Sequence, residues 1–326
     1  MTIRVIRGWI LKFGGNHVCA TIHPMQHQSK PDKSTYPLNN LGDSQELNLD
    51  SQDLFSLPEQ IGQFTDLKSL SVYKNQLTGL PENIWQLTDL EVLNIADNKF
   101  SILPEGIGNL TNLRMLDAGH NQLSALPRSL AKLACLKFLY LSNNHLTSIT
   151  FSIENLAELI YLNITDNQLS ELPEDIGKLA KLLELRLYNN QLRALPNSIG
   201  ELTALRELHV MNNQLNSIPE TISNLKNLNK LMLQSNQIEL LPDSLGSLSS
   251  LTEIDLRFNN LTDLPESIGD LKKLRFLDLR ANKLSSLPEN MGILKSLEKL
   301  DLRWNRFQSA PEWFAQLQER GCTIYT

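Results

Sequence analysis

The sequence predicts an α/β solenoid, in which short β-strands stack into one curved parallel sheet and compact turns line the opposite side. Three observations predict this fold class. Asparagines recur at intervals of 23 residues without an insertion or deletion, leucine-type residues keep fixed places around them, and a Leu-Pro pair follows most of them. Self-similarity at a period of about 20–50 residues is typical of stacked repeat architectures. The asparagines are Asn75, Asn98, Asn121, Asn144, Asn167, Asn190, Asn213, Asn236, Asn259, Asn282 and Asn305.

The first half of each unit predicts a strand. The unit reads L-x-x-L-x-x-L-x-L-x-x-N-x-L-x-x-L-P-x-x-I-G-x, and the stretch from Leu271 to Ile293 shows it almost complete. In its L-x-L element, Leu277 and Leu279, a period of two sends both leucines to one side of a strand and the residue between them to the other. Stacked units therefore predict a parallel sheet with leucines inside and variable residues outside.

The second half of each unit predicts a turn. Proline lacks an N–H group, so the Leu-Pro pair cannot continue a ladder and suits a turn or a short helical turn. The glycine that follows in most units, Gly292 in the stretch above, is expected to permit the sharp reversal into the next repeat. Because this half is bulkier across the stack than a strand, we expect the sheet on the concave side and short helical or 3-10 turns on the convex side.

The repeated asparagine is expected to have a structural role. The chain turns away from the sheet directly after the strand, which leaves backbone N–H and C=O groups without partners inside the molecule. A side-chain amide carries donors and an acceptor, so it can bond to such groups in its own unit and in the neighbouring one. We expect a buried ladder of eleven amides, with each loss costing about 1–3 kcal/mol.

The repeats also set the domain organisation. About twelve units are predicted, and they divide into a capping repeat at 41–63 and eleven repeats at 64–316. The first unit lacks the asparagine, and terminal repeats are commonly atypical because they cap the stack. Residues 1–40 form an N-terminal flank that is expected to be irregular, and 317–326 form a C-terminal cap. The stretch Glu312–Gly321 reads as a helix that closes the array.

The pattern resembles the leucine-rich repeat family, specifically its 23-residue LPxxIGxL type. That type is known from bacterial repeat proteins and from intracellular Ras-suppressor-like and plant Ras-group-related repeat proteins. The resemblance covers about 276 of the 326 residues. It implies a horseshoe with a concave parallel sheet, but the shared letters are the structural ones, so it does not identify a partner.

The charge of the chain and its cysteine usage indicate where in the cell the protein is located and which classes of partner are excluded. The net charge is −6, and because residues 1–40 carry +4, the rest of the chain carries −10. An acidic array argues against nucleic acid as the partner, and no stretch approaches the roughly 20 apolar residues of a membrane span. Cys19, Cys135 and Cys322 are far apart and odd in number, which favours a reducing compartment. We therefore expect a cytoplasmic monomer, with export by a signal-independent route as the alternative.

Chemistry-bearing motifs are absent from the sequence. It has no P-loop, no G-x-G-x-x-G, no H-E-x-x-H and no C-x-x-C, so no enzyme activity and no cofactor are expected. The flank does gather His17, Cys19, His23 and His27. Nitrogen and sulfur ligands could hold zinc, but this spacing matches no strong zinc signature, and we expect an irregular flank without a metal. A metal-binding or enzymatic role through this flank is the least favoured alternative.

The variable positions of the predicted strands indicate where a partner would bind. In the middle of the chain they place aromatic, methionine and polar side chains on neighbouring strands. Such residues are favoured at interfaces, although they also shield one another across strands as ordinary sheet neighbours. The candidate residues of this middle patch are Met115, Phe138, Tyr140, Tyr161, Arg186, Tyr188, His209, Met211 and Met232.

Toward the C-terminus the same face becomes charged. Asp255, Asp278 and Asp301 form one column, the next column is arginine, and aromatic residues flank both. Two interpretations stay open: a ladder of ion pairs, worth only about 0–1 kcal/mol for each exposed pair, or a surface that captures an acidic or carboxylate-bearing segment. The candidate binding residues here are Arg257, Phe258, Arg280, Arg303 and Trp304.

A preformed curved surface without catalytic motifs predicts a non-catalytic module that binds a protein partner on its concave sheet. The alternative is an exported effector, or a surface receptor-like repeat protein, that uses the same face.

Overall fold

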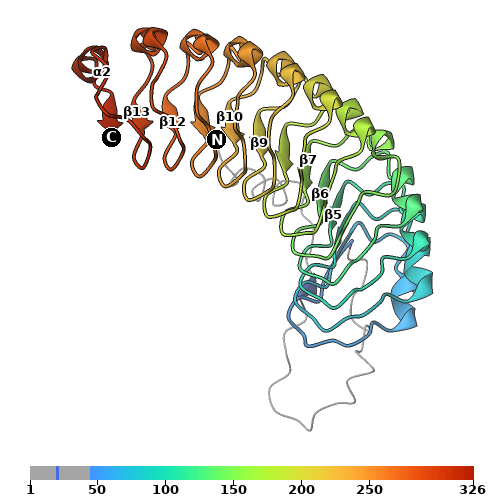
Figure 1. Cartoon of the computed structure of the whole chain (residues 1–326). Helices are drawn as coiled ribbons and strands as arrows, with labels where there is room; N and C mark the ends of the chain where they lie inside the picture. Colours follow the sequence, from blue (N-terminus) through green and yellow to red (C-terminus); the bar gives the residue numbers. More distant parts are fainter. Residues whose placement is uncertain (1–19, 22–44) are drawn as a thin grey trace.

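A computed structural model describes residues 20–21 and 45–326, and it confirms the solenoid. One parallel sheet runs in the order β1 to β14 along the inner side of an arc, and compact turns line the outer side (Figure 1). Neighbouring strands pair in register 23 residues apart, as in Leu185, Leu208 and Leu231. The strands are β1 Ala20–Thr21, β2 Glu46–Asn48, β3 Ser69–Ser71, β4 Val92–Asn94, β5 Met115–Asp117, β6 Phe138–Tyr140, β7 Tyr161–Asn163, β8 Glu184–Arg186, β9 Glu207–His209, β10 Lys230–Met232, β11 Glu253–Asp255, β12 Phe276–Asp278, β13 Lys299–Asp301 and β14 Thr323–Tyr325.

The convex side consists of single 3-10 turns. Most begin directly after the proline of the Leu-Pro pair, whose φ near −65° leads into the turn. η5 has three residues rather than five because its unit has Thr150 in place of the proline, and Phe151, which follows, is buried. The turns are η1 Glu59–Gln63, η2 Glu82–Gln86, η3 Glu105–Asn109, η4 Arg128–Lys132, η5 Ile153–Asn155, η6 Glu174–Lys178, η7 Asn197–Glu201, η8 Glu220–Asn224, η9 Asp243–Ser247, η10 Glu266–Asp270 and η11 Glu289–Ile293.

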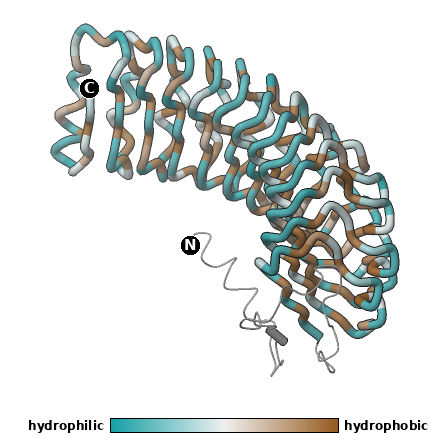
Figure 2. The backbone as a smooth tube through the Cα atoms, turned by 90° about the horizontal axis from the view of Figure 1, so that it is seen from below, coloured by the Kyte–Doolittle hydropathy of each residue, from teal (hydrophilic) through white to brown (hydrophobic). Residues whose placement is uncertain are grey.

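The core lies between the sheet and the turns and runs the length of the array. The inward leucines of each strand, such as Leu185 and Leu187, are fully buried. Hydrophobic and hydrophilic residues alternate along every coil, so apolar positions recur at the same places from unit to unit (Figure 2). Each strand and each turn packs against its nearest neighbours in the stack, so a unit buries its apolar face only through the units beside it.

The repeated asparagines form a continuous row of hydrogen bonds beside the sheet. Asn190 donates from Nδ2 to the carbonyls of Leu187 in its own unit and Ile164 in the preceding one, and its Oδ1 accepts from the N–H of Leu169. Ten of these asparagines are buried. The expectation of eleven buried amides is wrong at Asn305, which is half-buried because no further unit of this kind covers it.

The sharp change of direction occurs at the residue before each asparagine rather than at the glycine. At that place the backbone is left-handed, with φ of 55° at Asn189 and 51° at Asn212. The glycine is needed for a different reason. A Cβ on Gly200 would lie 2.2 Å from the backbone oxygen of Thr221 in the next turn, so the close approach of neighbouring turns excludes a side chain there.

Both ends of the described array are closed by additional elements. The helix expected at Glu312–Gly321 is α2, Phe314–Glu319, and Gly321 follows it with a φ of 93°. β14 then extends the sheet beyond β13. At the other end β1 pairs with β2. The remaining flank, including His17, Cys19, His23 and His27, lies outside the described residues.

Candidate partner-binding surface

The outward face of the concave sheet presents the variable side chains in columns, because each strand places its residues in register with the next. In the middle of the array, the residues half-buried on this face include Phe138, Tyr140, Tyr188, Met211 and Met232. Phe138 and Tyr140 lie on β6, Met232 lies on β10, and Tyr188 and Met211 lie two residues after β8 and β9. The structure thus brings them to one face of the sheet, on both sides of β7.

Two predicted members of the middle patch are buried rather than exposed. Met115 exposes 8% of its surface and Tyr161 exposes 5%. Neighbouring strands of a parallel sheet lie only about 4.8 Å apart, so large side chains in register cover one another. The Tyr161 ring packs 5.0 Å from the Tyr140 ring, and the Arg186 guanidinium lies 5.8 Å from its centre. This burial raises the pKa of Tyr161. At Met115 and Tyr161, neighbouring side chains of the sheet therefore shield one another from solvent.

A polar cluster lies beside these rings on β8 to β10. Arg186 pairs with Glu184 on its own strand. His209 Nε2 lies 3.0 Å from Glu207 Oε2, and Lys230 Nζ lies 3.4 Å from Glu207 Oε1. The hydrogen bond with His209, followed by the charge of Lys230, lowers the pKa of Glu207 to about 2 although partial burial acts in the opposite direction.

This cluster is also the place on the described sheet where metal-ligating atoms converge. Ligand atoms of Glu184, Glu207 and His209 lie within 4.8 Å of one another. The carboxylates already have cationic partners in Arg186 and Lys230, and such cations disfavour a bound metal ion by charge repulsion. We therefore interpret the cluster as an ion-pair network that fixes the polar side chains of the face.

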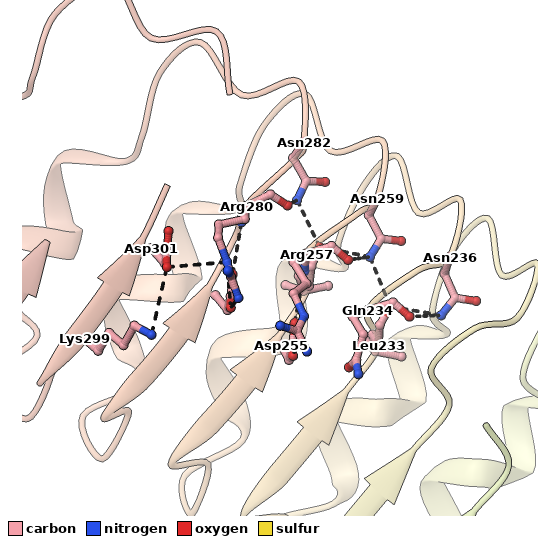
Figure 3. Close-up of polar contacts among 12 residues, drawn as sticks. Leu233, Gln234, Asn236, Asp255, Arg257, Asn259, Arg280, Asn282, Lys299 and Asp301 are labelled. Atoms are coloured by element: carbon pink, nitrogen blue, oxygen red, sulfur yellow. Dashed lines mark hydrogen bonds and ion pairs between the residues drawn. The ribbon is translucent and has the colours of Figure 1, made fainter. Parts of the chain in front are cut away.

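At the C-terminal end of the sheet, each aspartate pairs with the arginine two residues later. Arg280 holds Asp278 with two nitrogens, Nε at 2.9 Å from Oδ1 and Nη2 at 2.6 Å from Oδ2. Arg303 Nη2 lies 2.6 Å from Asp301 Oδ2, whereas Arg257 Nε approaches Asp255 Oδ2 only to 3.2 Å. Figure 3 shows Arg257 beside Asp255, and Asp301 in contact with both Arg280 and Lys299, with the row of asparagines beside them.

The aspartates at the two ends of this column differ in their electrostatics. Asp301 is fully buried, and burial acts to raise its pKa, but the hydrogen bond from Arg303 and the charges of Arg280 and Arg303 outweigh burial and lower the pKa. Burial raises the pKa of Asp255 to about 6, because the weaker contact with Arg257 does not compensate for the loss of water and Asp278 adds a like charge. The ion-pair network is therefore tight at β13 and loose at β11.

Large aromatic side chains stay exposed beside this network. Phe258 exposes 50% of its surface and Trp304 exposes 65%, and their rings lie 6.3 Å apart. The Arg303 guanidinium lies 5.8 Å from the centre of the Trp304 ring. Phe276, on β12 between the two, is also exposed. The surface at the C-terminal end of the sheet is therefore partly apolar, because these rings lie beside the charged arginine and aspartate columns.

Sequence reasoning found the columns but not all of their polar partners. Glu184, Glu207 and Lys230 were not among the predicted site residues, although they occupy the column directly before the first inward leucine of each strand. They contribute ion pairs that include a contact between adjacent strands, Lys230 with Glu207, and a pattern within one strand does not reveal such a contact. The burial of Asp255 and Asp301 has the same origin.

Comparison of the sequence with known protein families matches the chain to one family. The profile described as a leucine-rich repeat region matches residues 25–142, 119–234 and 147–267, and a second profile described as a leucine rich repeat matches 249–307. No curated protein matches the chain at a significant level.

Solved structures share the architecture. A leucine-rich repeat protein of Leptospira interrogans is 33% identical, with 88% of this chain and 85% of that chain covered and a TM-score of 0.61. An internalin of Listeria monocytogenes, InlF, is 26% identical, covers 86% of both chains and has a TM-score of 0.71. The Arabidopsis receptor kinase HAESA, solved with the peptide hormone IDA and the co-receptor SERK1, is 28% identical over 82% of this chain and 51% of that one, with a TM-score of 0.66.

Proposed function

The chain belongs to the leucine-rich repeat family, and on that premise we propose that it is a non-catalytic platform that binds a protein partner on its concave sheet. The observation that carries the proposal is the set of half-buried aromatic and methionine side chains on β6, on β10 and just after β8 and β9, with the buried Tyr161 ring of β7 between them. Such side chains offer a partner large contact area with adaptable packing. Their recurrence along one face of the curved sheet gives a surface that suits an extended or convex partner.

The size of the hollows in the sheet supports a binding role over a catalytic one. The hollow between β11 and β13, lined by Asp255, Phe276, Asp278 and Lys299 among others, has a volume of about 150 Å³. Sites for small molecules usually measure about 300–1,000 Å³. Of the charged groups that line it, Asp255 pairs with Arg257, Asp278 with Arg280 and Lys299 with Asp301, which leaves these side chains in ion pairs rather than in a nucleophile and base arrangement.

The related structures support a proteinaceous partner. HAESA, with which this chain shares its architecture, was solved in complex with a peptide hormone and a co-receptor. Within residues 20–21 and 45–326, no helix combines the length and the hydrophobicity needed to cross a bilayer. We propose a cytoplasmic monomer, because Cys135 and Cys322 are both unpaired and no local cysteine pair caps the described array. Fractionation of native cells and light scattering of the purified protein test these two points.

The binding proposal is tested by affinity capture from native lysate with two matched baits. In the first, Tyr188, Met211 and Met232 on the concave sheet are replaced by Ser. In the second, the exposed apolar residues Ile102 and Leu240, which lie outside the sheet, are replaced by Ser. We expect the concave variant to lose the partner and the second variant to retain it. Equal recovery by the two baits would refute binding on the concave face.

A further inference from the structure

The residue before each asparagine of the ladder is held in the left-handed conformation, and its identity changes at the C-terminal end. From Lys74 to Ser235 this place is occupied by polar residues, many of them Asn or Asp, with φ between 51° and 57°. These short polar side chains tolerate that conformation best after glycine. In the last three units the place is taken by Phe258, Ala281 and Trp304, with φ of 55°, 52° and 64°.

A bulky residue with positive φ is strained, because its Cβ lies too close to the following carbonyl oxygen, and burial does not offset that strain here. Phe258 and Trp304 expose 50% and 65% of their surfaces to solvent. They lie two units apart with Ala281 in the unit between them, and the small side chain of Ala281 leaves the two rings 6.3 Å apart. Backbone strain combined with exposed apolar surface is typical of a functional site.

Exposed cations lie close in sequence to the left-handed place of the last two units, whereas the aspartates of β11 to β13 are buried or held in ion pairs. Lys283 and Arg306 follow the asparagines of the last two units, are exposed, and form no ion pair with any residue that the structure describes. Arg303 keeps 39% of its side chain exposed, and its guanidinium lies near two rings, 5.8 Å from the centre of Trp304 and 5.0 Å from that of Tyr325. Of the aspartates on β11 to β13, Asp255 and Asp301 are buried, and Asp278 is half-buried and held by Arg280, so an incoming group meets the exposed cations first.

We infer that Phe258, Trp304, Lys283, Arg303 and Arg306 form a docking site, here called the rim site, for an acidic peptide segment that carries an aromatic side chain. The two rings provide the apolar floor on which the partner's aromatic side chain packs. The cations pair with carboxylates on either side of it. The inference rests on the proposed function, because it assigns the chemistry of a protein partner at the C-terminal edge of the same sheet.

Three short peptides test this assignment directly: acetyl-Asp-Glu-Phe-Glu-Asp-amide, its Ala-centred analogue, and acetyl-Lys-Lys-Phe-Lys-Lys-amide. Binding is followed by NMR of the exposed Trp304 indole, whose signal is distinguished from those of Trp9, Trp85 and Trp313 by its loss in Trp304→Asn. We expect the first peptide to bind about tenfold or more tightly than either of the others. Equal binding of the three peptides, or no shift of the Trp304 signal, would overturn the inference.

The variants Phe258→Asn and Trp304→Asn separate a binding role from a structural one, because asparagine occupies the same left-handed place at Asn143, Asn189 and Asn212. We expect each variant to lose about tenfold in affinity for the acidic aromatic peptide, measured by calorimetry, while its thermal midpoint stays unchanged or rises. Ser235→Asn, at the equivalent place outside the rim site, should change neither quantity. A lower thermal midpoint for the two aromatic variants would assign the rings to stability and refute the rim site.

The failure of this inference is distinguishable from failure of the proposed function. If Trp304→Asn captures the native partner as well as the original chain does, while the Tyr188, Met211 and Met232 variant loses it, the concave platform stands and the rim site does not. Replacement of Lys283 and Arg306 by Gln tests the contribution of the cations to binding. This change should weaken the acidic aromatic peptide several-fold and reduce the dependence of its affinity on salt, and an unchanged salt dependence would contradict the role of the cations.

Discussion

The asparagine row allows a quantitative prediction, because the structure specifies which hydrogen-bond partners are lost when an asparagine is replaced. In Asn190→Ala, the carbonyl of Leu187 keeps Asn213 Nδ2 at 3.0 Å, and the carbonyl of Ile164 keeps Asn167 Nδ2 at 3.4 Å. The N–H of Leu169 loses its acceptor, Asn190 Oδ1. One buried orphaned donor costs about 1–3 kcal/mol, so the free energy of unfolding should fall by about 2 kcal/mol.

The matched control is the last member of the row. Asn305 bonds to the same kinds of groups, the carbonyls of Leu279 and Leu302 and the N–H of Leu284, but it is half-buried. Water can replace its amide, so Asn305→Ala should cost only about 0.5–1 kcal/mol. It also acts at the end of the array, where local opening is easiest.

Urea unfolding monitored by circular dichroism compares the two variants, and amide hydrogen exchange locates the defect. In Asn190→Ala the Leu169 amide should exchange faster, while amides several units away keep their protection. The reasoning is refuted if Asn305→Ala is as destabilising as Asn190→Ala, or if the Leu169 amide remains as protected as before.

Three further predictions concern packing and charge. Gly200→Ala should destabilise the fold by about 1–3 kcal/mol through overpacking, whereas Gly79→Ala, whose Cβ would meet nothing within 4 Å, should be neutral; thermal unfolding of both variants checks this, and equal midpoints would contradict it. Because the folded state raises the pKa of Asp255 from 3.8 to about 6, it favours the protonated form, so this contribution to stability is complete below pH 3.8 and is lost as the pH rises through about 6. Asp255→Asn should therefore gain about 1–3 kcal/mol relative to the original chain above pH 6 and nothing below pH 4, and urea unfolding across this range would show a constant difference if the reasoning were wrong. Arg275→Ala, which removes the exposed two-point contact with Glu298, should cost at most about 1 kcal/mol at low salt, and a larger loss in the same denaturation assay would indicate a packing role.

The fold was predictable because its determinants lie within a single unit. Leu277 and Leu279 identify the strand by their spacing, Asn282 identifies the turn away from the sheet, and Pro288 marks the start of the convex 3-10 turn. The period then places every other unit in parallel register. These features depend on backbone chemistry that repeats identically, so one unit explains them all.

The properties that sequence reasoning missed depend on contacts between units. Tyr161 and Met115 are buried because their neighbours on adjacent strands are large, and no pattern within one strand reports this. The left-handed place before the asparagine was not recognised, since its occupants range from Lys74 to Trp304. The role of glycine was assigned to its own dihedral freedom, whereas at Gly200 the neighbouring turn imposes the requirement.

The unbroken 23-residue spacing has a consequence for inheritance. Every unit enters and leaves the stack at equivalent points and touches only its neighbours, so unequal recombination between two units of the gene removes or duplicates a whole coil and leaves every remaining interface intact. The length of the arc and the number of side-chain columns on its inner face are thus heritable quantities that change in whole steps. A lineage can extend or shorten its recognition surface in this way without passing through an unfolded intermediate form of the protein.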